Sequence, residues 1–509
     1  MCGIAGGYGG VGVDEGRRML GRLVHRGPDD QGDVRVNGSW IGHRRLSIVD
    51  VDGGHQPLRN EPDGLWLVGN GEIYNHEQVR GTLGGASFST SSDNEVALHL
   101  LADRDPGLLE QLEGMYALLA AGDDGFFLAA RDPVGIKPLY WARRGGSVRF
   151  ASELSAFDSE WLPHAEVFPP GCHWTPPGGL ERFADAVSES AAKPHGEARL
   201  NPAAQPPPEI LEATREMLVC SVERQMMGDV PVGVFLSGGL DSNLVAGIAA
   251  RYLSDRGEQL KTFAVGLKDS ADLMAAREAA QLLDSEHHER VYTAQEALDA
   301  VPKVVRAIEH FDPSLVRSAV PNYLLAEATA KHVKAVLTGE GADELFAGYE
   351  YLRDFTGAAE LQRELVRTVE DLHNLNLQRC DRVTMAHGLE ARVPFLDRQV
   401  IEFALELPAE WKLAPPGEPE KRLLRDAFTG WLPDELLWRE KSQFGDGSGA
   451  ASVLKNHMEE TISEEDFERD RGLTEPALRT REELAYYRIF AQHLPGVRPE
   501  RTVSRFATA

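Results

Sequence analysis

The sequence predicts two domains, an α+β domain dominated by antiparallel sheet followed by an α/β domain with a parallel sheet. The chain of 509 residues is longer than a single hydrophobic core usually supports. Residues 1–180 are rich in short extended segments punctuated by Gly and Asp-Gly turns. After residue 209, compact apolar strands alternate with helices, which indicates βαβ units.

The elements of the first domain follow from the spacing of its apolar residues. Extended apolar segments predict strands, and an Asp-Gly pair at Asp124-Gly125 predicts a hairpin turn. Apolar residues at helical spacing predict two helices. The expected strands span residues 39–50, 65–75 and 116–132, and the expected helices span 14–26 and 93–104.

The second domain has a different spacing of apolar residues. Its short apolar runs predict strands buried on both faces, and the longer amphipathic stretches between them predict covering helices. Beyond about residue 355 the pattern is mainly helical. The expected strands span 232–239, 261–267, 288–293 and 333–341, and two of the helices span 272–284 and 294–309.

A polar, proline-rich stretch separates the two patterns. Residues 188–208 have no periodic apolar face, which indicates an interdomain linker or a surface excursion. We therefore expect domains over residues 1–187 and 209–509.

Composition excludes several classes of protein. With 53 basic and 80 acidic residues the formal net charge is −27, which argues against broad nucleic-acid binding but allows an anionic small substrate. No apolar run reaches membrane-spanning length, and the N-terminus lacks a signal-peptide pattern. The four cysteines are far apart and form no CxxC pair, so a reducing cytoplasm is the simplest compartment.

The opening stretch MCGIAGGYG places a cysteine directly after the initiator methionine. Cys2 could be a buried, inert thiol at the start of a strand. If the methionine is removed, however, Cys2 carries both a thiol and a free α-amine, and an adjacent amine can activate a nucleophile. The motifs that follow favour the nucleophile.

Two loops at strand ends predict a nucleotide site. In VFLSGGLDSN, residues 234–243, two glycines allow close approach of the backbone and a helix begins near Asp241, an arrangement suited to phosphate. LTGEGADELFAGY, residues 337–349, likewise places glycines and acidic residues at the end of a second predicted strand. Asp241 and Asp343 would each contribute a carboxylate to Mg²⁺ bound with ATP.

Four segments of the first domain are interpreted together with Cys2 as parts of one predicted site. They are HRGPDD, HRRLSIVD, GNGEIYN and TSSDNE. A thiolate that attacks an amide creates an oxyanion, which the Asn70 side chain and the Gly71 N–H are suited to stabilise. Arg45 and Asp93 are candidates to hold the α-carboxylate and α-ammonium of an amino acid.

Two other motifs carry no function. Residues 7–12 match GxGxxG, but they lie among antiparallel strands without a βαβ unit, so a dinucleotide site is not expected. His287 and His288 lack zinc-ligand spacing and fit polar positions at the start of a strand.

The motifs MCGI, RGPD, LSIVD, NGEIYN, SGGLDS, GEGADE, LEARVPFLD and EKRLLRDAF, in this order, resemble the glutamine-hydrolysing asparagine synthetases of the bacterial B type. The resemblance covers nearly the whole chain outside residues 188–208 and the last few residues. It implies a class II glutaminase of the N-terminal-nucleophile type, with antiparallel sheets stacked between helices, joined to an ATP-pyrophosphatase domain. It further implies that glutamine supplies ammonia, which passes internally to β-aspartyl-AMP to form asparagine.

The resemblance also implies residue roles. Cys2 is the nucleophile, Glu340 is associated with forming the acyl-adenylate, and Lys421 stabilises charge in the adenylation step. Arg317 is the retained acceptor residue. Glutamine would be bordered by Arg45, Leu46, Ser47, Ile48, Val49, Asn70, Gly71, Glu72 and Asp93, and ATP by Phe235, Leu236, Ser237, Gly238, Gly239, Asp241, Ser242, Val265, Thr338 and Gly339.

Several positions depart from the family pattern. Leu315 and Val320 stand where hydroxyl residues are expected near the acceptor, and Arg317 could instead pair with a neighbouring acid such as Asp312. Three further departures are Ala342, Asn243 and Ser91. A ligase that amidates another carboxylate in natural-product assembly is therefore an alternative, and a catalytically inactive nucleotide-binding regulator is another. A homodimer is one assembly consistent with these features.

Overall fold

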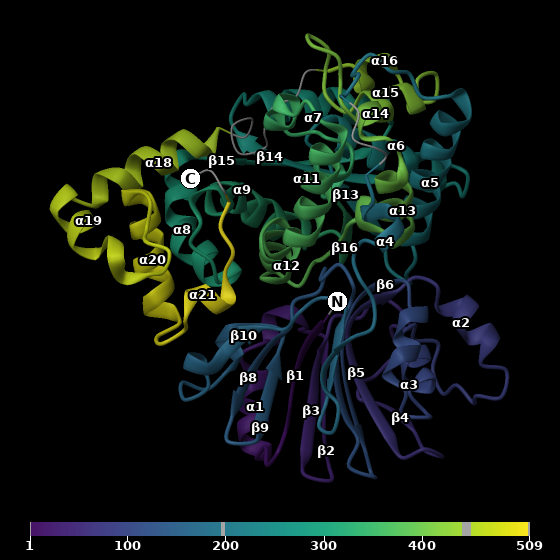
Figure 1. The fold of residues 1–509 in the computed structure, drawn as a ribbon, viewed down its shortest axis with the longest axis vertical. Coiled ribbons are helices and arrows are strands. Elements are labelled where there is room, and N and C mark those ends of the chain that lie inside the picture. Colours follow the sequence, from purple (N-terminus) through teal and green to yellow (C-terminus); the bar gives the residue numbers. More distant parts are fainter. Residues whose placement is uncertain (1, 195–198, 440–448, 507–509) are drawn as a thin grey trace.

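The computed structural model describes residues 2–194, 199–439 and 449–506. Figure 1 shows two domains stacked along the long axis, with β1 (Cys2–Tyr8) reaching up to the boundary between them. Among the described residues, no helix combines the length and the apolar composition needed to cross a bilayer.

The N-terminal domain contains two six-stranded antiparallel sheets, and the side chains of their facing surfaces form one apolar cluster that includes Ile4, Ile41 and Leu119. Helix α1 (Val13–Gly21) lies against the first sheet, and α3 (Glu95–Leu100) lies against the second beside α2 (His76–Thr82). The expected layering of stacked antiparallel sheets between helices is thus confirmed. In order, the first sheet is β10 (Ala165–Val167), β8 (Tyr140–Arg144), β9 (Ser147–Ala151), β1, β3 (Ser39–Arg45) and β2 (Asp30–Val36), and the second is β12 (Gly179–Arg182), β11 (Cys172–Thr175), β7 (Phe127–Arg131), β6 (Gly114–Gly122), β5 (Leu65–Ile73) and β4 (Leu58–Asn60).

The hairpin expected at Asp124-Gly125 is present, because β6 and β7 pair directly across this turn. Other elements of this domain are shorter than expected, among them α3, whose predicted span is residues 93–104. The strand predicted to reach residue 50 ends at Arg45, whose guanidinium donates to the backbone carbonyls of Val49, Asp50 and Val51 and folds that segment back. The helix expected over residues 14–26 ends at Gly21 and continues only as a 3₁₀ turn, η1 (Val24–Arg26).

The second domain contains a five-stranded, fully parallel sheet, as expected. From β13 the chain moves outward to β14 and β15, and then returns to β16 on the opposite side of β13. The switch point therefore lies between β13 and β16, where ligands bind in open α/β sheets. In order, the strands are β15 (Glu286–Tyr292), β14 (Lys261–Leu267), β13 (Val232–Phe235), β16 (Ala335–Leu337) and β17 (Glu390–Arg392).

Two apolar clusters cover the two faces of this sheet. One joins Val234 and Leu337 to the helices α5 (Pro208–Gln225), α6 (Leu240–Ser254) and α7 (Ala271–Leu282). The other joins Val265 and Val336 to the helices α8 (Ala294–Ile308) and α9 (Pro313–Thr329). This covering of both faces explains why the strands read as continuous apolar runs.

The rest of the second domain is helical, as expected. In Figure 1 the C-terminal helices, drawn in yellow-green, form a separate lobe beside α8 and α9. These helices are α18 (Ala450–Thr461), α19 (Glu464–Asp470), α20 (Arg481–His493) and α21 (Pro499–Thr502). The remaining helices are α4 (Glu189–Ala192), α10 (Ala342–Leu345), α11 (Ala358–Asp371), α12 (Asn376–Met385), α13 (Arg398–Glu406), α14 (Ala409–Lys412), α15 (Arg422–Phe428) and α16 (Asp434–Leu437).

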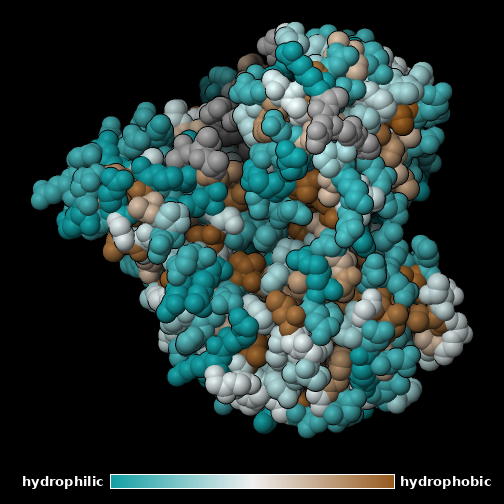
Figure 2. All heavy atoms as spheres, in the orientation of Figure 1, coloured by the Kyte–Doolittle hydropathy of each residue, from teal (hydrophilic) through white to brown (hydrophobic). Residues whose placement is uncertain are grey.

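The described part of the stretch 188–208 packs on the second domain rather than running free through solvent. Ala191 is fully buried, and its carbonyl accepts a hydrogen bond of 2.8 Å from the Gln362 side chain. The Leu200 N–H donates to the carbonyl of Thr356 at 2.9 Å. Figure 2 shows apolar atoms gathered where the upper and lower parts of the molecule meet, so the two domains share a partly apolar boundary.

Candidate active sites

Cys2 begins β1, and its backbone lies opposite Arg45 of β3. The Cys2 N–H donates to Asn70 Oδ1 at 2.9 Å, which ties the N-terminal strand of one sheet to β5 of the other. The side chain is only 7% exposed, and this burial raises the pKa of the thiol, while the N–H of Leu46 and the charge of Arg45 act in the opposite direction. A buried thiol of this kind needs a nearby base to form the thiolate.

Asn70 and Gly71 lie directly beside this cysteine. Asn70 Nδ2 is buried and has no hydrogen-bond partner among the described residues. It shares its amide carbon with the Oδ1 that contacts Cys2, so an unused donor sits next to the nucleophile. Gly71 has φ of +143°, and a Cβ there would lie 1.8 Å from the carbonyl oxygen of Met115, so the backbone here requires glycine.

The carboxylates near Cys2 are also buried. Asp93 accepts hydrogen bonds from the N–H of Ile73 at 2.6 Å and from Asn94 Nδ2 at 3.1 Å. Burial raises the pKa of Asp93, and burial together with Glu390 and Asp93 raises the pKa of Glu72 well above its ordinary value. An ammonium group entering this region would relieve the cost of keeping these carboxylates ionised.

The segment after β3 joins the two domains. Leu46 and Ile48 are buried and Val49 is partly buried, and all three pack into the apolar cluster of the second domain. The N–H of Ser47 donates to Asp29 Oδ2 at 2.8 Å, and the same oxygen accepts from Lys334 Nζ of the second domain at 2.7 Å. The segment LSIVD is therefore held from both sides.

The second domain also contributes two ionic side chains that sequence reasoning missed. Arg392 and Glu390 on the edge strand β17 are fully buried, and Arg392 Nε donates to Glu390 Oε1 at 2.5 Å. Arg392 Nη2 lies 3.9 Å from Glu72 Oε2, and the charge of Glu390 raises the pKa of Cys2. The motif LEARVPFLD contains both residues, but nothing in the sequence links them to Cys2.

The first nucleotide loop has the expected geometry. It follows β13 and leads into α6, which begins at Leu240. Ser242 Oγ accepts from the N–H of Ser237 at 3.2 Å and donates to the carbonyl of Gly239 at 3.0 Å, so the two serines close the loop on itself. Asn243, one of the departures, donates to the carbonyls of Gly238 at 3.2 Å and Leu436 at 3.0 Å, and so fastens the loop to α16.

The second loop lies directly against the first. A Cβ on Gly339 would lie 2.8 Å from Asp241 Cβ, so the absence of a side chain here lets the two loops meet. Lys421 Nζ joins them by contacting Asp241 Oδ2 at 2.5 Å and Asp343 Oδ1 at 2.7 Å. Although burial opposes protonation of Lys421, these two carboxylates raise its pKa above the ordinary value.

Glu340 and the remaining predicted nucleotide residues surround these loops. Arg379 of α12 bonds Glu340 Oε1, while burial raises the pKa of Glu340. The N–H of Thr338 donates to the carbonyl of Arg392 at 2.9 Å, and Ala342 is fully buried beside it. Phe235 ends β13, Leu236 follows it, and Val265 lies on the neighbouring strand β14.

Asp241 and Asp343 fit a magnesium ion bound with phosphate. Mg²⁺ is usually held by one or two carboxylates together with substrate phosphate oxygens, and it does not need an all-protein cage. No group of three or more His, Cys, Asp and Glu side chains that could hold a metal by itself occurs among residues 2–194, 199–439 and 449–506. The two aspartates share Lys421, so their side chains already converge on one point.

Helix α12 connects the two sites. Arg26 is fully buried, and its Nε donates to the carbonyl of Cys2 at 3.0 Å. Its Nη1 contacts Asp381 Oδ2 of α12 at 2.8 Å and Glu153 Oε1 at 2.9 Å. Arg379, two residues before Asp381, binds Glu340. Two residues of α12 therefore reach in different directions: Asp381 contacts Arg26, which binds the backbone of Cys2, and Arg379 binds Glu340 of the second loop.

The predicted acceptor residue has a different partner from the one considered. Arg317 on α9 pairs with an acid, as the alternative interpretation expected, but this acid is Glu482 of α20 at 3.1 Å and not Asp312. Asp312 instead caps α9 and binds Arg479 at 2.8 Å. Leu315 and Val320 are fully buried in the cluster that covers the sheet, where a hydroxyl would need a partner.

Comparison with known proteins identifies relatives along nearly the whole chain. The family model for the glutamine amidotransferase domain matches residues 1–168, and that for asparagine synthase matches residues 213–358 and 353–501. A probable glutamine-hydrolysing asparagine synthetase of Dictyostelium discoideum is 37% identical over 96% of this chain and 92% of its own length. Glutamine-hydrolysing asparagine synthetases of Arabidopsis thaliana and Oryza sativa subsp. japonica are each 38% identical over 91% of this chain, covering 82% and 80% of their own lengths.

Proposed function

The chain belongs to the family of glutamine-hydrolysing asparagine synthetases, and on that premise we propose how its two sites divide the reaction. The enzyme hydrolyses glutamine in its N-terminal domain and uses ATP in its second domain to convert aspartate into asparagine, with glutamate, AMP and pyrophosphate as the other products. The observation that carries this proposal is the coexistence of two sites in one chain, namely Cys2 beside the unused donor of Asn70 and the paired loops joined by Lys421.

In the first site, Cys2 Sγ attacks the carboxamide carbon of glutamine. Asn70 Nδ2 and the N–H of Gly71 donate to the oxygen that becomes negative. Collapse of this intermediate expels ammonia and leaves a thioester, which water then hydrolyses to glutamate and the free thiol. Once the preceding methionine is removed, the α-amine of Cys2 is the base that takes the thiol proton and passes it to the leaving nitrogen.

Glutamine itself is held by the charged groups around Cys2. We assign its α-ammonium to Asp93, because burial raises the pKa of this carboxyl and a neighbouring positive charge would stabilise its ionised form. Arg45 supports the site by holding the carbonyls of residues 49–51, and so it shapes the segment LSIVD that borders glutamine.

In the second site, a β-carboxylate oxygen of aspartate attacks the α-phosphorus of ATP and pyrophosphate leaves. The loop of residues 237–242, which leads into the N-terminus of α6, receives the pyrophosphate, and Lys421 balances charge on the transferring group. Mg²⁺ bound by Asp241 and Asp343 would neutralise phosphate charge. Ammonia then attacks the acyl carbon of β-aspartyl-AMP, forms the amide and displaces AMP.

The acceptor is aspartate, and we assign its recognition to Arg317. A guanidinium offers a planar fork that can hold a carboxylate through two hydrogen bonds. Arg317 Nε is paired with Glu482, so this carboxylate orients the guanidinium on α9.

Free thiols at Cys2, Cys172, Cys220 and Cys380 support the cytoplasm as the compartment. The homodimer stays a prediction.

The proposal is tested by measuring pyrophosphate release with a panel of carboxylic acids, each with glutamine or ammonium as the nitrogen source. Aspartate is expected to give the highest kcat/KM, with asparagine and AMP formed in equal amounts. Preference for a bulkier carboxylate would favour the natural-product ligase. Absence of both glutaminase activity and pyrophosphate release would favour the nucleotide-binding regulator.

A further inference from the structure

A cavity of about 620 Å³ lies at the junction of three parts of the chain, away from the nucleotide loops. The N-terminal domain contributes η1 and residues 153–162, the second domain contributes α8 and α12, and the C-terminal lobe contributes the end of α20. Its volume falls within the range of small-molecule sites. Since residues far apart in the sequence line it, the cavity forms only when the two domains and the C-terminal lobe are packed together.

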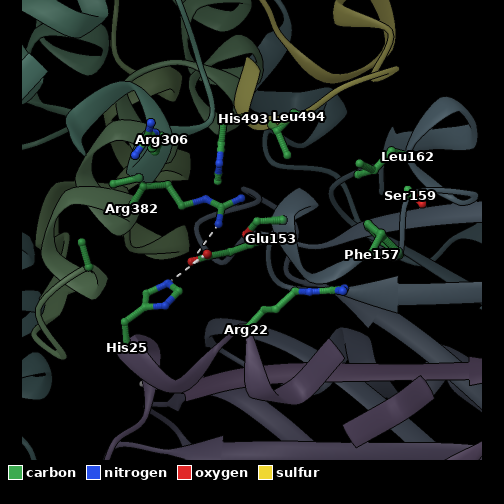
Figure 3. Close-up of a pocket in the computed structure, with 13 residues that line it drawn as sticks. Arg22, His25, Glu153, Phe157, Ser159, Leu162, Arg306, Arg382, His493 and Leu494 are labelled. Carbon is green, nitrogen blue, oxygen red and sulfur yellow. Dashed lines mark hydrogen bonds and ion pairs between the residues drawn. The ribbon is translucent and has the colours of Figure 1, made fainter. Parts of the chain in front are cut away.

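One side of the cavity is basic. Figure 3 shows Arg306, Arg382, His493 and His25 on the same side of the view, around the single lining carboxylate, Glu153. This carboxylate is already neutralised, because it contacts Arg26, Arg382 and His25, each at 2.9 Å. It therefore leaves no net negative charge to repel an incoming anion.

Two of the basic groups retain donors for a ligand. Arg306 is exposed and makes no hydrogen bond or ion pair with any described residue. Arg382 is fully buried, and its Nε has no hydrogen-bond partner within the described part of the chain. A buried guanidinium nitrogen without an acceptor is costly unless something supplies one. Arg382 is balanced by Glu153 and Glu309, and Arg22 by Asp158, so among the described residues the uncompensated positive charge of the cavity wall is that of Arg306.

The opposite side of the cavity carries three apolar side chains beside Ser159 and Arg22, and the guanidinium of Arg22 is paired with Asp158 at 2.7 Å. Leu162, Leu494 and Phe157 lie on the other side of the view in Figure 3, and all three are nearly buried. Inorganic phosphate alone would leave this wall uncovered. The walls together match a molecule with an acidic group at one end and an apolar body at the other.

We propose that this interdomain cavity binds a small organic anion, which places its acidic group against Arg306 and Arg382 and its apolar body against Phe157, Leu162 and Leu494. Glutamine, aspartate and ATP occupy other residues, so the cavity is a binding site additional to those of the reaction. Through Glu153 and Arg26, its wall is in contact with the backbone of Cys2.

The probe for this site is 8-anilinonaphthalene-1-sulfonate, which joins a sulfonate to an aromatic body, and its fluorescence is titrated with the full-length protein in the presence of saturating ATP. N-phenyl-1-naphthylamine, which has the same aromatic body without the sulfonate, is titrated in parallel. We expect saturable binding of the sulfonate and at least about tenfold weaker binding of the neutral compound, because a charge-assisted hydrogen bond is lost.

Two variants and a control locate the site. Arg306→Ala removes an exposed side chain and is expected to weaken sulfonate binding about tenfold or more, without changing the affinity for the neutral compound. Ala307→Trp fills the cavity without removing a polar group and is expected to abolish binding of both compounds. Arg363→Ala, an exposed arginine on α11, is the matched control and should bind like the wild type.

The proposal is overturned if the wild type shows no saturable sulfonate binding. It is equally overturned if Arg306→Ala and Ala307→Trp both retain wild-type affinity, since the probe then sits elsewhere. If Arg306→Ala and Arg363→Ala weaken sulfonate binding equally, the change in net charge alone explains the weaker binding, and a defined site is contradicted. Thermal melting of each variant verifies that a loss of binding is not a loss of fold.

Discussion

Replacing Asn70 by alanine removes two interactions at once, and the structure separates their consequences. Asn70 Oδ1 accepts the buried hydrogen bond from the Cys2 N–H at 2.9 Å. Asn70 Nδ2, buried and without a partner among the described residues, is the proposed donor to the oxyanion. The first interaction exists in the resting enzyme and so affects stability, and it also holds the nitrogen that serves as the base once the methionine is removed, so its loss contributes to a lower kcat as well. The second forms only as charge develops on the substrate and so affects kcat.

The two magnitudes follow from this difference. Loss of the bond to Cys2 leaves a buried N–H unpaired and is expected to cost roughly 1–3 kcal/mol in the free energy of unfolding. Loss of one oxyanion donor typically lowers kcat by about 100- to 1000-fold, or about 3–4 kcal/mol in transition-state stabilisation. Ammonia-dependent asparagine synthesis should stay within about twofold of the wild type, because the nucleotide loops belong to the other domain.

The assay measures glutamate release and ammonia-dependent pyrophosphate release in the same preparation, together with urea unfolding. Asn60→Ala is the matched control, because Asn60 of β4 is also buried in the N-terminal domain but its Nδ2 is already bonded to Asp63 Oδ2 at 2.6 Å. The control should lose stability with less than about a tenfold loss of glutaminase kcat. If Asn70→Ala loses no more glutaminase kcat than Asn60→Ala, the assignment of the oxyanion donor is refuted.

Further predictions concern the nucleophile, the loops, the acceptor and one buried lysine. Cys2→Ala should abolish glutamine-dependent synthesis yet retain ammonia-dependent synthesis, and an equal loss of both would show that Cys2 is structural. Asp241→Ala and Asp343→Ala should each remove several kcal/mol of transition-state stabilisation from pyrophosphate release while sparing glutaminase turnover, and near-normal adenylation would exclude them as metal ligands. Arg317→Lys should raise KM for aspartate about ten- to a hundredfold with little change in KM for ATP, whereas parallel changes in both would point to a structural role. Lys412 is fully buried, its Nζ has no hydrogen-bond partner in the described chain, and burial lowers its pKa from 10.5 to about 7. Its lowered pKa means that stability is fully present above pH 10.5 and is lost as the pH falls toward 7. Lys412→Met should therefore raise the free energy of unfolding at pH 7 by up to about 4 kcal/mol and have no such effect above pH 10.5, which urea unfolding at both pH values measures.

Local chemistry explains why much of the architecture could be predicted. The strand before Ser237, the glycine pair and the helix after it all follow from neighbouring residues, because apolar runs, backbone freedom and helix starts are short-range properties. The same holds for the hairpin at Asp124-Gly125. Prediction failed where a side-chain contact without a periodic signature decided the backbone, as where Arg45 ends β3 by binding the carbonyls of residues 49–51, four to six positions further along the chain.

The sequence by itself determined the two domains, the two strand-end loops and the candidate nucleophile, because each depends on residues close together in the chain. Only the tertiary structure decided which groups surround them. Arg26 and Asp381 are 355 residues apart and meet only because α12 lies against the glutaminase sheet. Arg392 and Glu390 reach the environment of Cys2 because β17 is an edge strand at the domain boundary. The charged residues in such contacts follow no periodic pattern in the sequence, because the packing of whole domains, and not the neighbouring residues, determines which side chains meet.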